Sequence, residues 1–173
     1  ALHKGHESLI LHSKKKCDIT ICSIFVNPTQ FNDKTDYDNY PKKLDSDLAI
    51  LKSLCCDIVY CPNKNDIYNK KEVLKKLQFK GISEILEGQY RPGHFDGVAT
   101  IVEKLFNIIE PDYAFFGEKD LQQLYVVKQL VKDLNIKTQI IGCPTIREKN
   151  GLAKSSRNQL ISKEDLEKSS IIF

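Results

Sequence analysis

Short apolar runs alternate with segments of helical period along most of the chain, and this alternation constrains the fold more than any other feature of the sequence. The runs are rich in β-branched and aromatic residues, as buried strands are, and they fall at 18–26, 57–61, 113–116 and 137–143. Apolar residues at three- and four-residue steps predict amphipathic helices over about 5–13, 41–54, 98–109 and 121–134. Strands that alternate with helices predict a parallel sheet covered by helices on both faces. The sequence therefore indicates the α/β fold class.

The middle of the chain is less regular than the rest. A short strand is predicted over 78–82. The stretch 87–96 is predicted to be a loop, because it contains Gly88, Pro92 and Gly93.

Length, charge and hydropathy agree with one globular domain and exclude two classes of partner. The chain has 173 residues, of which 41% are hydrophobic, and this is enough to bury a core. The net charge of +3 is too balanced to indicate a nucleic-acid surface. No apolar run is long enough to span a membrane. We therefore expect neither nucleic acid nor a membrane as a partner.

The cysteines and the start of the chain bear on the cellular compartment. Six cysteines are present, and none forms a C-x-x-C pair or a spacing typical of zinc sites. We expect them to be reduced thiols, and no secretory leader opens the chain, so the predicted location is cytoplasmic. The sequence contains no methionine and begins with Ala1, which indicates a piece of a longer protein.

The first motif with chemical meaning is His3-Lys4-Gly5-His6, at the start of the first predicted helix. Two imidazoles three residues apart project from nearly the same face of a helix. The free N–H groups and the positive end of the helix dipole attract an anion, and Gly5 lets a phosphate approach the backbone closely. Such a site suits nucleotidyl transfer, in which charge grows on phosphate oxygens. The alternative is a pair of surface histidines, because so short a pattern recurs by chance.

A second polar motif, Gly117-Glu118-Lys119-Asp120, directly follows the third predicted strand, where parallel sheets bind their ligands. Lys119 is placed to bind phosphate as a point charge. Asp120 is placed to cap the next helix or to help hold Mg²⁺. Of the following pair, Gln122 and Gln123, only one can face the cleft. The alternative is an ordinary charged helix start.

Two more motifs follow the fourth and the first predicted strands. Lys154-Ser155-Ser156-Arg157-Asn158 combines hydroxyls with cations, as a flexible phosphate clamp does. Asn27-Pro28-Thr29-Gln30-Phe31 offers the amides of Asn27 and Gln30 to a small polar substrate, with Phe31 as an apolar wall. The alternatives are a surface loop for the former and an Asn-Pro turn for the latter.

Together these motifs resemble the pantothenate synthetases, the pantoate–β-alanine ligases of the HxGH nucleotidyltransferase superfamily. Nearly the whole chain takes part, through five stretches in family order at 1–6, 23–31, 91–95, 116–120 and 155–158. The resemblance implies a Rossmann-like sheet of the adenylyltransferase type in a catalytic domain over 1–160. It also implies that 161–173 begins a small C-terminal lid domain, and that the first strand of the sheet and most of the lid are missing from this chain.

The resemblance implies an ATP-dependent ligation in two steps, with Mg²⁺ as cofactor. The pantoate carboxylate attacks the α-phosphate of ATP to give pantoyl adenylate and pyrophosphate, and the amine of β-alanine then displaces AMP to give pantothenate, on the route to coenzyme A. A carboxylate is already an anion, so the first step needs positioning and charge stabilisation more than a base. The partners implied are pantoate, β-alanine, ATP and a second copy of the chain in a homodimer.

Matched motif by motif, the resemblance makes His6 the catalytic histidine and places Asn27, Gln30 and Gln123 at pantoate and β-alanine. The ATP-binding residues that it implies are Ala1, Leu2, His3, Lys4, Gly5, His6, Gly117, Glu118, Lys119, Asp120, Ile146, Lys154, Ser155, Ser156 and Arg157. It assigns no residue as a metal ligand. Lys154 departs from the family, which has methionine there, so that an added phosphate contact and a side chain in solvent are both open.

Two other functions stay open at this point. Another HxGH-type nucleotidyltransferase would share the two-histidine motif and the sheet. An inactive remnant would bind nucleotide without turnover, because a site without its lid does not protect an acyl adenylate from water. A basic RNA-binding module is disfavoured, since the lysines are not interleaved with exposed aromatic residues.

Overall fold

The strands form two parallel pairs in the computed structural model, which describes residues 1–68, 79 and 81–172. β1 (Ile21–Ser23) pairs with β2 (Ile58–Tyr60), and β3 (Tyr113–Gly117) pairs with β4 (Gln139–Cys143). The α/β class and the parallel direction are confirmed. The single continuous sheet is not observed, because no ladder joins β1 to β3 among the described residues.

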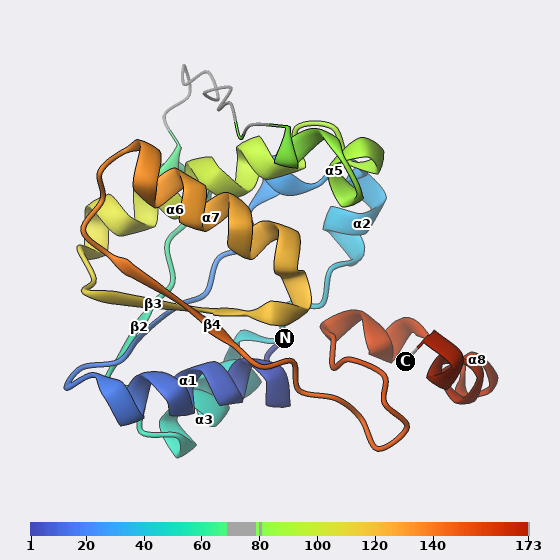
Figure 1. The fold of residues 1–173 in the computed structure, drawn as a ribbon. Helices are drawn as coiled ribbons and strands as arrows, with labels where there is room; N and C mark the ends of the chain where they lie inside the picture. The colour runs from blue at the N-terminus through green and yellow to red at the C-terminus, as the bar shows by residue number, and fades with distance from the viewer. Residues whose placement is uncertain (69–78, 80, 173) are drawn as a thin grey trace.

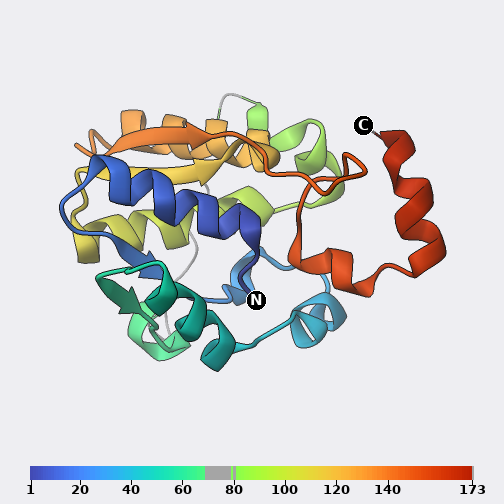
Figure 2. The ribbon, with the colours of Figure 1, turned by 90° about the horizontal axis from the view of Figure 1, so that it is seen from below.

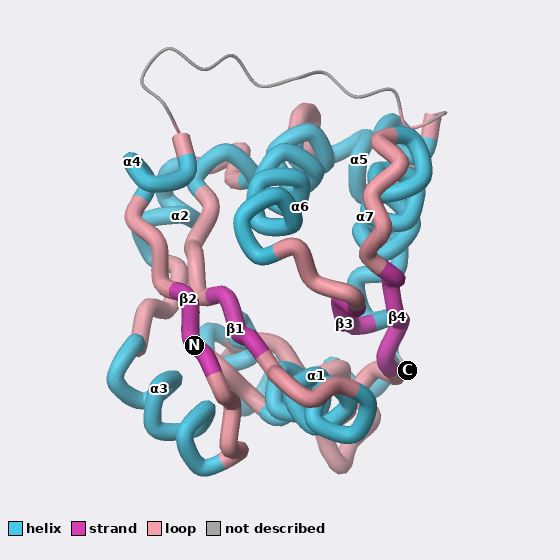
Figure 3. Tube along the Cα trace, turned by 90° about the vertical axis from the view of Figure 1, so that its left-hand side faces the viewer, coloured by secondary structure: helices cyan, strands magenta, loops and turns pink. Residues whose placement is uncertain are grey.

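Helices lie on both sides of the strands. α1 (Lys4–Lys16) and α3 (Leu44–Ser53) lie on one side, and α6 (His94–Ile109) and α7 (Leu121–Asp133) lie on the other (Figure 1). Figure 3 shows the two strand pairs apart from each other, with α6 above and α1 below. In the described part of the chain, no helix is both long and apolar enough to cross a membrane.

Shorter elements connect these layers. The remaining α-helices are α2 (Lys34–Asn39), α4 (Lys64–Ile67), α5 (Glu87–Tyr90) and α8 (Lys163–Lys168). The 3₁₀ turns are η1 (Pro28–Gln30), η2 (Ile82–Glu84), η3 (Glu118–Asp120), η4 (Ser156–Leu160) and η5 (Ser169–Ile172). Beyond β4 the chain runs to α8 at the side of the molecule (Figure 2).

The main hydrophobic core lies on the α6 side of the strands. α6 contributes six buried side chains, Phe95, Val98, Ala99, Ile101, Val102 and Phe106, and α7 contributes Val126, Val127 and Leu130. α6 packs against α7 and against η1, and side chains of β3 and β4 pack against the same core. Its nearly continuous apolar sequence is therefore explained by burial on more than one face.

Two predictions for the middle of the chain are wrong. Phe79 and Gly81 are not in a strand, and Ile82 begins η2, while Gln78 and Lys80 lie outside the described residues. The predicted loop over 87–96 contains α5 and the first turn of α6. Gly93 has φ +77° at the N-cap of α6, so the chain reverses there within one residue and enters the helix at once.

α6 approaches η1 so closely that only glycine fits at the contact. A Cβ atom on Gly97 would lie 2.5 Å from the Thr29 carbonyl oxygen. Asn27, at the N-cap of η1, donates from its amide to the Gly97 carbonyl at 3.1 Å. This contact joins the segment after β1 to the helix that carries the core.

Substitution of Gly97 by alanine is expected to destabilise the protein by about 1–3 kcal/mol, because the added methyl group must push η1 away from α6. Gly117→Ala is a matched control, since its Cβ would meet nothing within 4 Å and its φ is −74°. Urea denaturation of both variants measures the free energy of unfolding. Equal stabilities would contradict the close contact between α6 and η1.

Candidate active site

One cavity collects most of the residues that the sequence predicts to bind ATP or the acid substrates. It has a volume of about 310 Å³ and lies where α1 begins, where β3 ends and where the chain leaves β4. The predicted residues that line it are His3, Gly5, His6, Gln30, Gly117, Lys119, Asp120, Gln123, Ile146, Lys154, Ser155, Ser156 and Arg157. Motifs far apart in the sequence thus meet at the carboxyl ends of parallel strands.

Reciprocal hydrogen bonds between His3 and His6 fix the N-terminus of α1. His3 is the N-cap, and its Nδ1 accepts from the Gly5 N–H at 3.1 Å. The His3 N–H donates to Nδ1 of His6 at 3.3 Å, which completes a capping box. Because each Nδ1 is an acceptor, each neutral ring carries its proton on Nε2. Both rings line the cavity, and these N–H groups are left to donate to a ligand.

Burial keeps the two imidazoles neutral at physiological pH. Burial, followed by the neighbouring His3 ring, lowers the pKa of His6 to about 4. Burial, followed by the ammonium groups of Lys119 and Lys154, also lowers the pKa of His3. The ring centroids are 4.0 Å apart, so two imidazolium charges there would repel each other. The pair therefore acts through hydrogen-bond donors.

Gly5 is required by the cap itself. A Cβ atom at this position would lie 2.8 Å from Cε1 and 3.0 Å from Nδ1 of His3, which is closer than real side chains approach. The absence of a side chain therefore lets the His3 ring fold over the first turn of α1. Close approach of a phosphate to Gly5 remains a prediction.

Asp47 supports this motif from α3 and was missed in the sequence. Its side chain is buried, and its Oδ1 accepts from the Leu2 N–H at 2.6 Å. α3 turns Asp47 and Leu51 inward, whereas Leu44 and Leu48 are exposed, so the predicted apolar face of this helix is partly wrong. The signal in the sequence was the position of Asp47, three residues after Leu44 and four before Leu51, which places a carboxylate on the apolar face of the helix.

Lys119 and Asp120 enter the cavity from η3, just after β3. Nζ of Lys119 lies 2.9 Å from Oδ1 of Asp120. Asp120 is the N-cap of α7 by position but makes no side-chain capping hydrogen bond, so the capping alternative is wrong. Its carboxylate remains beside the lysine at the cavity wall. Glu118 does not line the cavity.

Gln122 and Gln123 divide their roles, as predicted. The amide nitrogen of Gln122 donates to the carbonyl of Ile82 at 2.6 Å, and its oxygen accepts from the Glu87 N–H at 3.0 Å. Gln122 therefore holds η2 and α5 against α7. Gln123 lines the cavity and is the member of the pair that a ligand can reach.

A hairpin after β4 presents Lys154. Arg147 and Ala153 form an antiparallel bridge, which closes this hairpin. The Lys154 N–H donates to the Ile146 carbonyl at 2.9 Å. Nζ of Lys154 lies 2.5 Å from Oε2 of Glu148, and the lysine side chain is 22% exposed. Of the two alternatives for Lys154, the side chain in solvent is therefore excluded.

Ser156 and Arg157 contact the segment around α2. The Arg157 guanidinium binds both carboxylate oxygens of Asp36, at 2.9 and 3.2 Å, and lies over the Tyr40 ring. The Ser156 hydroxyl donates to the Tyr40 hydroxyl at 3.2 Å. Asp36 and Arg157 are 121 positions apart, so no local spacing could have predicted the pair.

The side-chain amide of Asn27 forms its hydrogen bonds with other residues of the protein, and Asn27 does not line the cavity. Its amide nitrogen donates to the Gly97 carbonyl and, at 3.4 Å, to Oε1 of Gln30. Its oxygen accepts from the Thr29 N–H and from the Tyr68 hydroxyl. These hydrogen bonds give Asn27 a positioning role beside Gln30, and its contact with a substrate remains a prediction.

Arg91 and His94 hold the backbone of Gln30 at the cavity. Nδ1 of His94 donates to the Gln30 carbonyl at 2.7 Å, and the Arg91 guanidinium does so at 3.4 Å. Burial lowers the pKa of His94, so the neutral ring keeps Nε2 as an acceptor. The stretch 91–95 therefore positions the backbone of the Gln30 motif.

Besides Glu118, three of the predicted ATP-binding residues do not line the cavity, namely Ala1, Leu2 and Lys4. The Leu2 N–H is taken by Asp47. Nζ of Lys4 pairs with Glu7 at 2.7 Å, and the lysine side chain is 68% exposed. These positions therefore shape the motif around His3 without facing the cavity.

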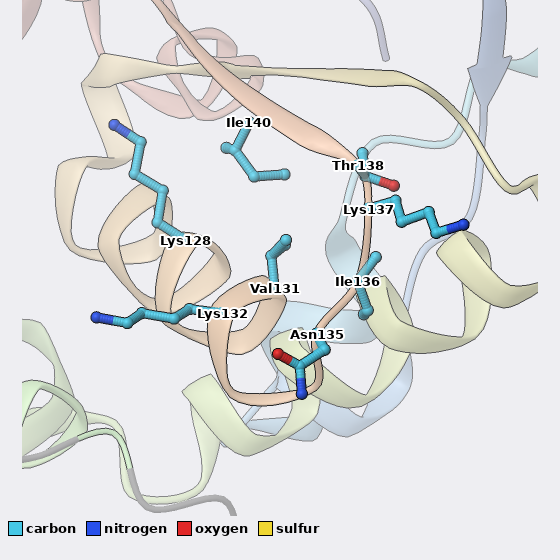
Figure 4. A pocket seen from close by; sticks show the side chains of 8 residues that line it. All are labelled: Lys128, Val131, Lys132, Asn135, Ile136, Lys137, Thr138 and Ile140. Carbon is cyan, nitrogen blue, oxygen red and sulfur yellow. The ribbon is translucent and has the colours of Figure 1, made fainter.

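A second depression lies at the other end of α7. It has a volume of about 550 Å³ and holds Lys128, Lys132 and Lys137 around an apolar floor (Figure 4). It contains none of the residues predicted to bind a ligand. The smaller cavity is therefore the candidate active site.

The chemistry of this cavity is that of phosphate binding. Four cations line it, namely Arg91, Lys119, Lys154 and Arg157, together with the imidazole donors. Among the described residues, no group of three or more His, Cys, Asp or Glu could hold a metal by itself. Mg²⁺ that is bound through phosphates needs only one or two carboxylates, and Asp120 fits that requirement. Fold and site together define an α/β protein with a cation-lined cavity, suited to phosphate, at the ends of its strands.

Comparison with known proteins identifies the family. The chain belongs to the family described as pantoate-beta-alanine ligase, whose model matches residues 1–173. It is 47% identical over 172 residues to a pantothenate synthetase of Acinetobacter baumannii, and 49% identical over 172 residues to that of Aquifex aeolicus. Each alignment covers 99% of this chain and 61% of the relative. The chain thus spans about three fifths of the length of these relatives.

Solved structures agree with this assignment. A pantothenate synthetase of Thermus thermophilus superposes with a TM-score of 0.95 at 39% identity, over 99% of this chain and 62% of that one. A pantoate-beta-alanine ligase of Francisella tularensis, complexed with beta-gamma ATP and beta-alanine, superposes with a TM-score of 0.95 at 48% identity. This second alignment covers 99% of this chain and 66% of the other.

Replacement of His6 by glutamine is expected to flatten the pH dependence of stability between pH 6.5 and about 4. In this window the unfolded chain binds a proton at His6 and the folded chain does not, so stability falls as the pH is lowered, by up to about 3 kcal/mol. Glutamine suits this position of a capping box and does not titrate. Urea denaturation across the window measures the difference. Parallel pH profiles of the two proteins would contradict the low pKa of His6.

Proposed function

We propose that the protein containing this chain is an AMP-forming ligase that joins pantoate to β-alanine through a pantoyl adenylate. The observation that carries the proposal is the convergence of the two-histidine motif, Lys119, the 154–157 clamp and Gln30 with Gln123 in one cavity. Membership of the family and the ligands of the Francisella tularensis structure support the same substrates.

The first step calls for stabilised phosphate charge and a fixed nucleophile. The Nε2–H groups of His3 and His6 are free to donate to phosphate oxygens, because both Nδ1 atoms are occupied. Lys119 and Arg157 supply positive charge at the same cavity. Because the attacking carboxylate is already ionised, these donors lower the barrier without a general base.

The acid substrates belong at the side of the cavity formed by Gln30 and Gln123. Phe31 lines the same cavity as an apolar wall. His94 and Arg91 fix the Gln30 backbone, so that its amide meets the substrate in one orientation. Attack by the amine of β-alanine on the activated carboxyl group then releases AMP. When bound with ATP, Mg²⁺ would neutralise phosphate charge, with Asp120 as the carboxylate placed to hold it.

The proposal extends to domain organisation, location and assembly. Residues 1–160 form the nucleotide-binding domain, and 161–173 begin the lid, for which the place of α8 at the side of the molecule gives support (Figure 2). A cytoplasmic location is supported by the six free cysteines. For a homodimer the support is the family resemblance.

The test is AMP release that requires pantoate, ATP and β-alanine together, measured on the full natural protein that carries these residues. His6→Ala is expected to slow AMP release by about 10²–10³-fold, as loss of one oxyanion-type donor does. His12→Ala is the matched control, since the exposed His12 bonds to the Ser8 carbonyl within α1 and does not line the cavity. Nucleotide transfer that ignores β-alanine would overturn the proposed ligase, and an unchanged rate in His6→Ala would overturn the role of His6.

A further inference from the structure

Lys154 has the least exposed side chain of the four cations that line the candidate site. Each of the four cations that line the cavity forms an ion pair with a carboxylate, as Lys154 does with Glu148. Lys154 is 22% exposed, against 30% for Arg91, 36% for Lys119 and 46% for Arg157. Its ammonium group is therefore the one for which loss of a partner is most costly.

The hairpin that carries both members of this pair fixes them relative to each other. Its turn is closed by the Glu148 N–H, which donates to the Leu152 carbonyl at 2.7 Å, and by the Gly151 N–H, which donates back to the Glu148 carbonyl at 3.0 Å. The Lys154 N–H is bound to the Ile146 carbonyl. The pair is thus a property of one local element and is independent of distant segments.

Of the ion pair, only the lysine reaches the cavity. Lys154 lines it and Glu148 does not. Both act on the same end of it, because the ammonium group of Lys154 contributes to lowering the pKa of His3, whereas the carboxylate of Glu148 opposes that shift. Glu148 therefore holds Lys154 from outside the cavity, beside the imidazole donors.

We propose that Glu148 is an exchangeable counterion, which holds Lys154 while the site is empty and yields it to a phosphate group of the nucleotide. This inference rests on the nucleotide binding proposed above and adds a residue that has no place in that proposal. Glu148 is a positioning residue, since it acts on the ligand through Lys154.

Exchange is favourable for both partners. The Glu148 side chain is 39% exposed, so it can turn to water with a small loss, because an ion pair this exposed contributes little. The ammonium group has three donors and no fixed plane, so it can leave a carboxylate oxygen for a phosphate oxygen by a small rotation. A triphosphate carries several negative charges and attracts the lysine more strongly than one carboxylate does. After release of pyrophosphate, Glu148 neutralises the ammonium group again.

Calorimetric titration of the protein with ATP in the presence of Mg²⁺ tests the exchange. Glu148→Gln is expected to lower the Kd for ATP by about 1.5- to 5-fold, because no ion pair has to be broken. Lys154→Met is expected to raise it by about 10-fold or more. In the double variant the Glu148→Gln change is expected to have no further effect, since the residue to be released is gone.

Two controls separate exchange from a general change in charge or fold. Glu164→Gln removes the carboxylate of another Glu–Lys pair, the one with Lys168 at 2.6 Å, and is expected to leave the Kd for ATP unchanged. Titration with adenosine, which lacks phosphate, is expected to give the same Kd with wild type and Glu148→Gln. Thermal unfolding by circular dichroism confirms that each variant is folded.

Three results would overturn the proposed exchange while nucleotide binding stands. They are weaker or unchanged ATP binding by Glu148→Gln, an equal gain in the Lys154→Met background, and an equal gain for adenosine. Absence of ATP binding by the wild-type protein would overturn the proposed function and this inference together. The two failures are thus distinguishable in one titration series.

Discussion

The reciprocal hydrogen bonds between His3 and His6 determine three properties of the site at once. They satisfy N–H groups that the first turn of α1 leaves without partners, they place the proton of each neutral ring on Nε2, and they keep both rings at the cavity wall. Asp47 holds the preceding backbone from α3, and the small size of Gly5 makes room for the His3 ring. The two imidazole donors are therefore part of the cap at which α1 begins, and they cannot be moved without loss of that cap.

Charge around the cavity is balanced before any ligand arrives. Lys119, Lys154 and Arg157 are each matched to a carboxylate, at 2.9, 2.5 and 2.9 Å respectively. A pocket with several bare cations would lose stability through repulsion and desolvation. Because the matching carboxylates are themselves half-exposed or exposed, they can yield to phosphate oxygens at little cost. A site of this kind combines a stable empty state with strong attraction for a polyanion.

A feature of the fold can be predicted from the sequence when residues close together along the chain determine it. The parallel strands follow from apolar runs bounded by turn residues, and α6 follows from its helical period, because neighbouring residues decide both. The two-histidine motif could likewise be placed on a helix start. The boundary at Gly93 was missed, since a left-handed glycine can either begin a helix or sit in a loop. The pairing of Asp36 with Arg157 could not be predicted from the sequence, because only the tertiary fold brings residues 121 positions apart into contact.

Gln30 and Gln123 line one cavity although no ladder joins β1 to β3 among the described residues. Gln30 follows β1 and Gln123 follows β3, so a shared helix must set the distance between the two halves of the cavity. α6 does so: His94 binds the Gln30 carbonyl, and the body of the helix packs against α7, which carries Gln123. Gly97 fixes the separation, because any larger residue there would press on the Thr29 carbonyl. The buried face of α6 is thus as much a determinant of the site as the residues that line it.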